Sequence, residues 1–377
     1  MKKIAILCGR YLPGYKDGGP VRTLINLTNC LGKEYNFIII TNDRDHGDKK
    51  PYKGIKYTEP NKVGDAEVWY LKPKGFTFKT IRKLTKNADL IYICGPYDDY
   101  AYKTLFLKKM GLITNPVVVA SMGSFSKGAY QLKNHKKSLY INICRILGLF
   151  KDLTWSVTSQ IEEKDVRKIL GKNTRCIIAE DLPRAVPKFQ IKVKETTTKI
   201  IFLSRICEMK NLLYAIKIIK SLNYNIAFDI YGTLEDQQYW EKCQKLLQSL
   251  PDNIKWEYKG VADSEKVIDL FSAYDIFLFP TLGENFGHVI FEALAAGCIP
   301  VISDQTPWID LEEQKCGFTI PLALEERFKS VIGMLCEMSD KDYTVLRKNA
   351  KTYAMKKYDD SVKNTGYRTI FDTLTRK

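Results

Sequence analysis

Two glutamates eight residues apart, Glu284 and Glu292, form the strongest chemical feature of the sequence. They follow a strand-like apolar run that ends at Pro280, and a helix over the intervening residues would point both carboxylates the same way, about 12 Å apart or less. Carboxylates accept hydrogen bonds from hydroxyl groups, so one glutamate could hold a hexose and the other the ribose diol of a nucleotide. The alternative is a turn residue and a solvated helix carboxylate, and the surrounding glycines favour the binding interpretation.

The segment around these glutamates has the features of a phosphate-binding helix start. Gly283 and Gly287 permit close approach of the backbone to a ligand, and a helix is predicted to open at Asn285. The first N–H groups of a helix have no partners within it, and the helix dipole favours an anion at that end. The segment leaves through Gly297 and Pro300 into another predicted strand, and this strand–turn–helix–strand order supports a binding role.

A second segment places two cations after another predicted strand. Arg205 and Lys210 flank a turn between the run Lys199–Ser204 and a helix expected over Leu212–Leu222. A diphosphate leaving group gains negative charge as a glycosidic bond breaks, so fixed cations here would stabilise the transition state more than the ground state. Two surface cations are the alternative, which is disfavoured because cations at a helix start oppose the helix dipole.

A loop with paired glycines lies near the start of the chain. The segment Tyr11–Pro20 contains Gly18 and Gly19 and separates the first predicted strand from a helix that begins at Val21. Paired glycines at a helix start suit backbone contact with a phosphate or a sugar. The pattern is not the G-x-G-x-x-G dinucleotide fingerprint, and a plain flexible loop explains it equally well.

The elements that must position these residues follow an alternating order. Short β-rich runs that are apolar on both faces alternate with helical patterns in both halves of the chain, which is typical of parallel sheets covered on both sides. The sequence therefore predicts an α/β protein with two Rossmann-like doubly wound domains, over residues 1–185 and 199–355, joined by a linker over 186–198. Ligands bind beyond the carboxyl ends of strands in such sheets, so two domains face to face would share one cleft.

Together these segments resemble the retaining GT-B glycosyltransferases of family 4 (glycosyl transferases group 1), and within them the bacterial sugar transferases of capsule and lipopolysaccharide synthesis. The resemblance covers nearly the whole chain and is most specific at the Glu-(any seven)-Glu signature. It implies a first domain that binds the acceptor, a second that binds the nucleotide sugar across a cleft, and a last helix, about Asp360–Leu374 within residues 356–377, that crosses back to the first domain. The other matching segments are Ser204–Asn211, Phe228–Gly232, Tyr258–Val261 and the Gly18-Gly19 loop.

The resemblance also implies roles for individual residues. Arg205 and Lys210 would grip the diphosphate, and Glu284 would be the third catalytic residue, in contact with the donor sugar. Glu292 would bind the ribose. The base would lie near Gly232 and Val261. The remaining implied donor contacts are Gly18, Gly19, Ser204 and the backbone amides of Asn285, Phe286 and Gly287.

The sequence departs from the family pattern at Met122. Many relatives have His-Gly or Pro-Arg-Gly after the fourth strand of the first domain, and methionine cannot donate a hydrogen bond to a donor sugar as His or Arg would. Ser121, Ser124 or Lys127 is expected to compensate, or else the enzyme is slow or unusual in its donor. A solvated helix face is the alternative for the lysines among the acceptor-side candidates, which are Gly123, Ser124, Lys127 and Lys137.

The expected reaction transfers a hexose from a nucleoside diphosphate sugar with retention, by front-face substitution through an oxocarbenium-like state. UDP is the expected nucleotide and GDP the second choice, from their frequency in the family. A double displacement needs a carboxylate nucleophile beneath the anomeric carbon, and no first-domain carboxylate is obviously placed for that. Neither a metal nor another cofactor is expected, because Arg205, Lys210 and the helix amides would replace a metal at the diphosphate, and because no D-x-D motif is expected in the chain.

The net charge of +16 is concentrated in one half of the chain. Residues 1–185 contain 33 Lys and Arg against 17 Asp and Glu, whereas residues 186–377 contain 26 of each. Basic stretches with apolar residues, within 72–83, 102–110 and 136–150, suit an anionic bilayer, where each cation contributes on the order of 1 kcal/mol. The expected partners are a nucleotide sugar, a glycan or polyprenyl-linked saccharide and the inner face of the cytoplasmic membrane; a basic domain without a membrane role is the alternative.

Other features of the sequence bear on location and on rival functions. No run approaches 18 apolar residues, the N-terminus lacks a secretory pattern, and ten scattered cysteines suit a reducing compartment, so we expect a cytoplasmic, peripheral protein. A nucleotide-sugar 2-epimerase would use histidines, of which the chain has three. Nucleic acid is not an expected partner, because no RRM, KH or helix-turn-helix pattern occurs. A catalytically weak binding protein stays open because of Met122.

Overall fold

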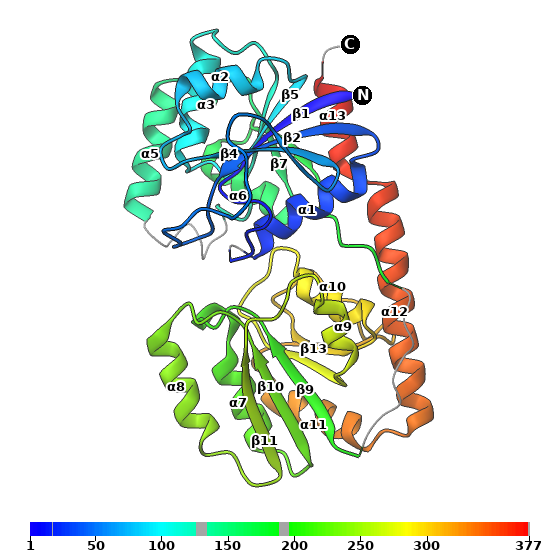
Figure 1. The fold of residues 1–377 in the computed structure, drawn as a ribbon. Coiled ribbons are helices and arrows are strands. Elements are labelled where there is room, and N and C mark those ends of the chain that lie inside the picture. Colours follow the sequence, from blue (N-terminus) through cyan, green and yellow to red (C-terminus); the bar gives the residue numbers. More distant parts are fainter. Residues whose placement is uncertain (17, 126–133, 188–195, 376–377) are drawn as a thin grey trace. The chain divides into compact units, whose positions relative to one another are not determined.

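The computed structural model describes residues 1–16, 18–125, 134–187 and 196–375 of the chain. The chain forms two compact units (Figure 1). Unit 1 contains Met1–Leu182 and Ser361–Lys377, and unit 2 contains Pro183–Asp360. The chain therefore enters unit 2 once and returns to unit 1 for its last residues.

Unit 1 is built on an eight-stranded sheet that is parallel except where β3 pairs with β4 at one edge. The central strands are buried along nearly their whole length, as expected of a parallel sheet covered on both faces. The spatial order is β3-β4-β2-β1-β5-β6-β7-β8. The strands are β1 (Lys2–Leu7), β2 (Tyr35–Asn42), β3 (Asn61–Val63), β4 (Ala66–Leu71), β5 (Leu90–Cys94), β6 (Val117–Ala120), β7 (Thr154–Val157) and β8 (Arg175–Ile178).

Helices from both ends of the chain pack on this sheet. The C-terminal helix α13 belongs to the core of unit 1, because the ring of Phe371 lies 5.1 Å from that of Tyr35 and 5.9 Å from that of Phe37, centroid to centroid. Ion pairs between Arg368 and Glu34 and between Lys2 and Asp372 add to this contact. The described helices of unit 1 are α1 (Gly19–Leu31), α2 (Phe78–Thr85), α3 (Asp99–Lys109), α5 (Asn134–Ile146), α6 (Gln160–Leu170) and α13 (Gly366–Leu374).

The C-terminal segment differs from the single helix that was predicted over residues 360–374. The long helix α12 (Asp340–Lys363) ends first, and α13 then begins at Gly366. The hydroxyl of Thr365 accepts a hydrogen bond from the N–H of Tyr367 and so caps the new helix. A Cβ on Gly366 would lie 1.9 Å from the carbonyl oxygen of Ile178 in β8, so glycine is required for this close approach to the sheet.

Unit 2 is built on a six-stranded sheet in which every pairing is parallel. The strands are β9 (Thr198–Leu203), β10 (Ile226–Tyr231), β11 (Ile254–Gly260), β12 (Ile276–Phe279), β13 (Ile299–Ser303) and β14 (Phe318–Ile320). The described helical elements that follow them are η1 (Glu208–Lys210), α7 (Leu212–Lys220), α8 (Gln237–Leu247), α9 (Val267–Ser272), α10 (His288–Ala295), α11 (Glu325–Glu337) and most of α12.

The order of the strands in unit 2 identifies where a ligand is expected to bind. The sheet runs β11-β10-β9-β12-β13-β14, so the chain builds outward from β9 in one direction and then restarts at β12 in the other. Ligands of such sheets bind beyond the carboxyl ends of the two strands at this reversal. In unit 1 the corresponding reversal lies between β1 and β5, and the Gly18-Gly19 loop follows β1.

The predicted fold class, two Rossmann-like doubly wound units of parallel sheet, is confirmed by the two sheets. The strand β4 was missed because its burial alternates between buried and partly exposed residues, whereas the prediction searched for runs that are apolar on both faces. All ten cysteines are free, and burial raises the pKa of the Cys8 thiol to about 12. Among the described helices, none combines the length and the apolar character that crossing a membrane needs.

Candidate functional site

The site in unit 2 begins with the turn that follows β9. The strand ends at Leu203, and the chain then forms the short helix η1, in which Lys210 is buried. Asn211 follows with φ 59°, the left-handed conformation that asparagine tolerates better than most residues. Its side-chain amide donates to the carbonyl of Pro280, at 2.9 Å. This bond joins the turn after β9 to the end of β12.

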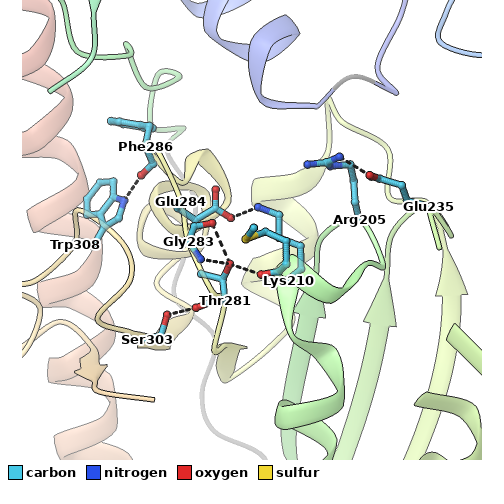
Figure 2. Close-up of polar contacts among 10 residues, drawn as sticks. Arg205, Lys210, Glu235, Thr281, Gly283, Glu284, Phe286, Ser303 and Trp308 are labelled. Carbon is cyan, nitrogen blue, oxygen red and sulfur yellow. Dashed lines mark hydrogen bonds and ion pairs between the residues drawn. The ribbon is translucent and has the colours of Figure 1, made fainter. Parts of the chain in front are cut away.

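The turn that follows β12 is bonded to the same helix. The N–H of Leu282 and the hydroxyl of Thr281 both donate to the carbonyl of Met209, at 2.9 and 3.1 Å. The hydroxyl of Ser303, at the end of β13, donates to the carbonyl of Thr281 at 2.6 Å. Figure 2 shows the contact between Ser303 and Thr281 beside the Gly283 turn. The loops at three strand ends are therefore bonded to one another.

Lys210 and Glu284, both predicted as catalytic residues, form an ion pair at this point. The Lys210 ammonium donates to Glu284 Oε1 at 2.6 Å (Figure 2). The two side chains are 11% and 15% exposed, and the ammonium also lies 5.8 Å from the centroid of the Phe279 ring. A pair with this little solvent contact is screened weakly, so it forms a polar, charged centre at the strand reversal.

Gly232 supports the same turn from the end of β10. It has φ 147°, and a Cβ there would lie 1.7 Å from the carbonyl oxygen of Ser204. Its N–H donates to the carbonyl of Gly260, and the hydroxyl of Tyr258 donates to its carbonyl. The predicted donor contacts Ser204 and Gly232 are thus adjacent, and the exposed Val261 follows Gly260 at the end of β11.

The start of α10 is shaped by the glycine turn that the sequence indicated. Gly287 has φ 79° and precedes the first residue of α10, His288, rather than lying inside a helix that opens at Asn285. The carbonyl of the preceding Phe286 accepts a bond from the Trp308 indole N–H at 2.6 Å. The predicted backbone-amide donors therefore lie in a fixed turn before the helix, not in its first turn.

Two other predicted residues have charged partners that sequence reasoning missed. Arg205 pairs with Glu235, and both side chains are about half exposed. Figure 2 shows this pair apart from Lys210 and Glu284. Glu292 is buried, and Arg184 approaches its carboxylate to 3.4 Å. Glu235 follows β10, so a search of every strand end would have found it, whereas Arg184 carries no sequence signal of its own.

The Gly18-Gly19 loop of unit 1 is anchored by a buried aspartate. Asp45 Oδ2 accepts hydrogen bonds from the N–H groups of Tyr15 and Lys16, at 2.8 and 3.2 Å. Gly18 has φ 61°, and among the described residues no heavy atom would lie within 4 Å of a Cβ at Gly18 or Gly19. The loop thus has a fixed base and open space beside its glycines.

The expectation that the chain contains no D-x-D motif is wrong, because Asp45 belongs to the sequence Asp43-Arg44-Asp45. Asp43 accepts from the Arg44 guanidinium at 2.8 Å and from the Tyr57 hydroxyl at 2.9 Å, so both aspartates hold protein groups. Over residues 1–16, 18–125, 134–187 and 196–375, no group of three or more His, Cys, Asp or Glu side chains is arranged to hold a metal ion.

One acceptor-side candidate of unit 1, Gly123, is bonded to a second buried carboxylate, that of Glu162. Met122 and Gly123 both have positive φ, 47° and 71°, and Glu162 accepts from the Gly123 N–H at 2.6 Å. The N–H of Ser124 donates to Ser121, and the Lys137 ammonium lies 5.3 Å from the Tyr97 ring centroid. Lys127 lies outside the described residues. Glu162 was not predicted from the sequence, since it belongs to no motif, and Asp45 was missed although it lies in an Asp-x-Asp sequence.

Part of the chain is similar in sequence to known proteins. Residues 184–353 match the family model Glycosyl transferases group 1. Glycogen synthase of Fusobacterium nucleatum is 27% identical over 161 residues. That alignment spans 42% of this chain and 34% of the synthase, so the chain matches about a third of the length of this curated relative.

Solved structures extend the similarity to nearly the whole chain. WaaG, a glycosyltransferase involved in lipopolysaccharide biosynthesis, is 14% identical with a TM-score of 0.69, over 99% of this chain and 100% of WaaG. Anabaena HepE in complex with UDP-glucose is 16% identical with a TM-score of 0.69, over 99% of both chains. At these identities the similarity shows the fold, and the fold is GT-B.

Proposed function

We propose that this protein is a retaining glycosyltransferase that moves a hexose from a nucleoside diphosphate sugar to a glycan or polyprenyl-linked saccharide in surface polysaccharide synthesis. The observation that carries the proposal is the Lys210–Glu284 pair at the reversal of strand order in unit 2. The match of residues 184–353 to Glycosyl transferases group 1 supports the same activity.

The paired charges suit a donor that carries both a diphosphate and a sugar. Lys210 supplies a positive charge for the diphosphate, and Glu284 supplies hydrogen-bond acceptors for the sugar hydroxyls. When the donor binds, the diphosphate takes over Lys210 and Glu284 turns to the sugar, so neither charge is left buried without a partner. Arg205 adds a second cation, and Glu292 binds the ribose diol. UDP is the first choice of nucleotide, in line with the UDP-glucose bound by HepE, and GDP is the second.

The proposed reaction is front-face substitution. The bond between the anomeric carbon and the diphosphate oxygen breaks, and the acceptor hydroxyl oxygen bonds to the same face of that carbon. A donor phosphate oxygen accepts the hydroxyl proton, so the products are the glycoside and the nucleoside diphosphate. Lys210 and Arg205 stabilise the charge that grows on the leaving group. Because these cations neutralise the diphosphate, we propose that no metal is required, and near-complete loss of activity in EDTA would contradict this.

Nucleotide titration and a matched pair of variants test the proposal. We expect UDP to bind the purified protein measurably by isothermal titration calorimetry. Lys210→Met should lower kcat by about 10²- to 10³-fold, the usual loss when a fixed charge at a developing anion is removed. Lys217→Met changes an exposed lysine on α7 and should have no effect. If no nucleoside diphosphate binds, the proposal is wrong, and if the donor alone is converted to its 2-epimer, the epimerase alternative is correct.

The acceptor side of the proposal includes an anionic membrane surface. Three apolar residues of α5, and the residue directly after the helix, are exposed at helical spacing. We call these four residues the α5 stripe: Leu139, Ile143, Ile146 and Leu147. Ile146 is 85% exposed. Cations flank the stripe at Lys136, Arg145 and Lys151, and residues 134–152 contain a single acid, Asp152.

The neighbouring end of α3 extends this surface. Lys109, the last residue of α3, lies close to Gly148, because a Cβ added at Gly148 would be 3.4 Å from the Lys109 ammonium. Met110, which follows Lys109, is exposed. Exposed apolar residues bordered by cations match the interfacial zone of an anionic bilayer. We therefore propose that the α5 stripe inserts among lipid headgroups and brings a polyprenyl-linked acceptor within reach, on the cytoplasmic face of the membrane.

Vesicle flotation tests this membrane proposal. The protein should float with vesicles of phosphatidylcholine and phosphatidylglycerol at low salt, and bind pure phosphatidylcholine severalfold less. Ile146→Ser should weaken flotation severalfold, because it removes apolar area from the interface. Ile309→Ser changes an equally apolar residue of unit 2 that is 73% exposed and should change nothing. Equal binding to both vesicle types, or equal loss in both variants, would contradict the proposal.

A further inference from the structure

Arg184 lies where the chain enters unit 2 and reaches three groups of that unit. It is two residues after Leu182, the last residue of the first segment of unit 1. One guanidinium nitrogen, Nη1, donates to the carbonyl of Ser264 at 3.0 Å and to Glu292 Oε1 at 3.4 Å. The other, Nη2, donates to the carbonyl of Glu265 at 3.2 Å. The side chain is 20% exposed, and that of Glu292 is 7% exposed.

The groups that Arg184 joins belong to the end of the site where the nucleoside is proposed to bind. Ser264 and Glu265 lie in the loop after β11 that begins with Val261, the proposed neighbour of the base. Glu292 lies on α10 and is the proposed ligand of the ribose. One side chain thus sets the position of a carboxylate and of a loop on two different elements.

The chemistry of the side chain fits this role. A guanidinium has five N–H donors in a rigid fork and can serve several acceptors at once, whereas the ammonium of lysine is a point charge on a flexible stem. A buried carboxylate also requires a cation or several donors nearby. A carboxylate has about four acceptor sites, and Arg184 bonds to one oxygen of Glu292.

We infer that Arg184 is a positioning residue for nucleoside recognition, which holds the Glu292 carboxylate and the 261–265 loop in the geometry that binds ribose and base. This inference rests on the proposed function, because it takes Glu292 as the ribose ligand. It goes beyond that proposal in assigning a specificity role to a residue of the connecting chain that touches no substrate.

Selectivity between UDP and 2′-deoxy-UDP tests the inference in a way that a purely structural role would not affect. The wild-type protein should prefer UDP by about tenfold, the usual effect of one hydrogen bond to a charged group. Arg184→Met should weaken UDP binding about tenfold, so that the ratio of the affinities for UDP and for 2′-deoxy-UDP becomes close to one. Arg184→Lys should recover part of the ratio. Glu292→Gln should have a similar effect, and the double variant should add little, because the two residues act together.

The control and the contrary outcomes separate this inference from the proposed function. Arg327→Met removes another arginine ion pair of unit 2, with Glu312 on the surface, and should leave both affinities unchanged. If the wild type binds no nucleoside diphosphate, the proposed function is wrong. If it binds UDP but shows no preference over 2′-deoxy-UDP, or if Arg184→Met and Arg184→Lys lose affinity for both equally, the inference is wrong and nucleotide binding stands. Melting temperatures of the variants identify any loss that comes from unfolding.

Discussion

Units 1 and 2 reverse their strand order in the same way but carry different groups on the loops at their strand ends. In unit 2 the turns after β9 and β12 carry charged side chains, Lys210 and Glu284, that bond to each other. In unit 1 buried carboxylates, Asp45 and Glu162, bond to the backbone of glycine-containing turns. The first arrangement could supply charge to a ligand, and the second could supply shape and backbone groups. Under the proposed function, one fold therefore supports two kinds of binding surface, which differ through their loops.

The two units also differ in their overall charge. Counted over the sequence, unit 1 has 36 Lys and Arg against 18 Asp and Glu, whereas unit 2 has 23 against 25. Unit 2 is nearly neutral overall, which suits the single small anionic ligand proposed for it. Unit 1 has a broad positive surplus, which suits an extended anionic partner. The comparison predicts that variants of unit 2 act on nucleotide binding and variants of unit 1 on the acceptor.

The largest effect is expected where backbone geometry holds the unit 2 site together. Gly232→Ala would place a Cβ 1.7 Å from the carbonyl oxygen of Ser204, at φ 147°. Either the turn after β9 moves or β10 does, so we expect destabilisation of more than about 3 kcal/mol and loss of UDP binding. Urea unfolding and UDP titration measure the two effects.

The matched glycine of unit 1 sharpens this expectation. Gly19→Ala meets no described heavy atom within 4 Å and lies at the first position of α1, so its stability should change by no more than about 0.5 kcal/mol. Should both variants lose stability equally, the contrast between a crowded site in unit 2 and an open loop in unit 1 would be mistaken.

Sequence patterns predicted the elements better than the partners. The alternation of apolar runs and helices was sufficient for the fold, because parallel sheets require it. The rule that ligands lie beyond strand ends brought attention to Lys210 and Glu284, which the structure joins. Their roles in donor binding stay predictions. Arg184 and Glu162 could not be predicted, since each reaches its partners through the fold from a segment without a motif. The start of α10 was misplaced because Gly287 interrupts the turn in the left-handed conformation.

Replacing a buried acid of unit 1 is expected to have a smaller effect on stability, and to stabilise the protein rather than destabilise it. Burial raises the pKa of Asp181 to about 7 from its ordinary 3.8. Between these values the folded state binds more protons than the unfolded state, so the free energy of unfolding falls as the pH rises from about 4 to about 7. Asp181→Asn removes this penalty and should stabilise the protein at pH 8 by about 2 to 4 kcal/mol, with no gain at pH 4. Urea unfolding at both pH values measures the difference.

Asp275 is the matched acid of unit 2. It accepts from the N–H of Lys199 and the hydroxyl of Tyr343, and it lies 3.8 Å from the buried Arg347. Asp275→Asn should therefore destabilise the protein at pH 8, because it leaves a buried cation without its counter-charge. If both substitutions change stability in the same direction, the view that unit 2 pairs its buried charges while unit 1 tolerates an unfavourable one is incorrect.

The smallest effect concerns the turn that carries the acceptor-side candidates. Glu162 accepts three hydrogen bonds, from the N–H groups of Gly123 and Thr158, each at 2.6 Å, and from the Thr158 hydroxyl at 2.8 Å. In Glu162→Gln one acceptor oxygen becomes an NH₂ donor that cannot bond to an N–H group, so the variant should lose about 1 to 2 kcal/mol of stability. Its KM for the acceptor should rise while its UDP affinity stays unchanged.

Glu163→Gln provides the control for this prediction. Glu163 follows Glu162 on α6, and it forms an ion pair with Arg167, one turn further along the same helix. Partly exposed pairs of this kind contribute about 0.3 to 0.5 kcal/mol, so the control should be nearly silent in stability and in KM. A loss of UDP affinity in Glu162→Gln at unchanged acceptor KM would reverse the assignment of ligands to the two units. The acceptor KM and the UDP affinity of this variant therefore show whether the turn held by Glu162 serves the acceptor, which a measurement of stability alone cannot show.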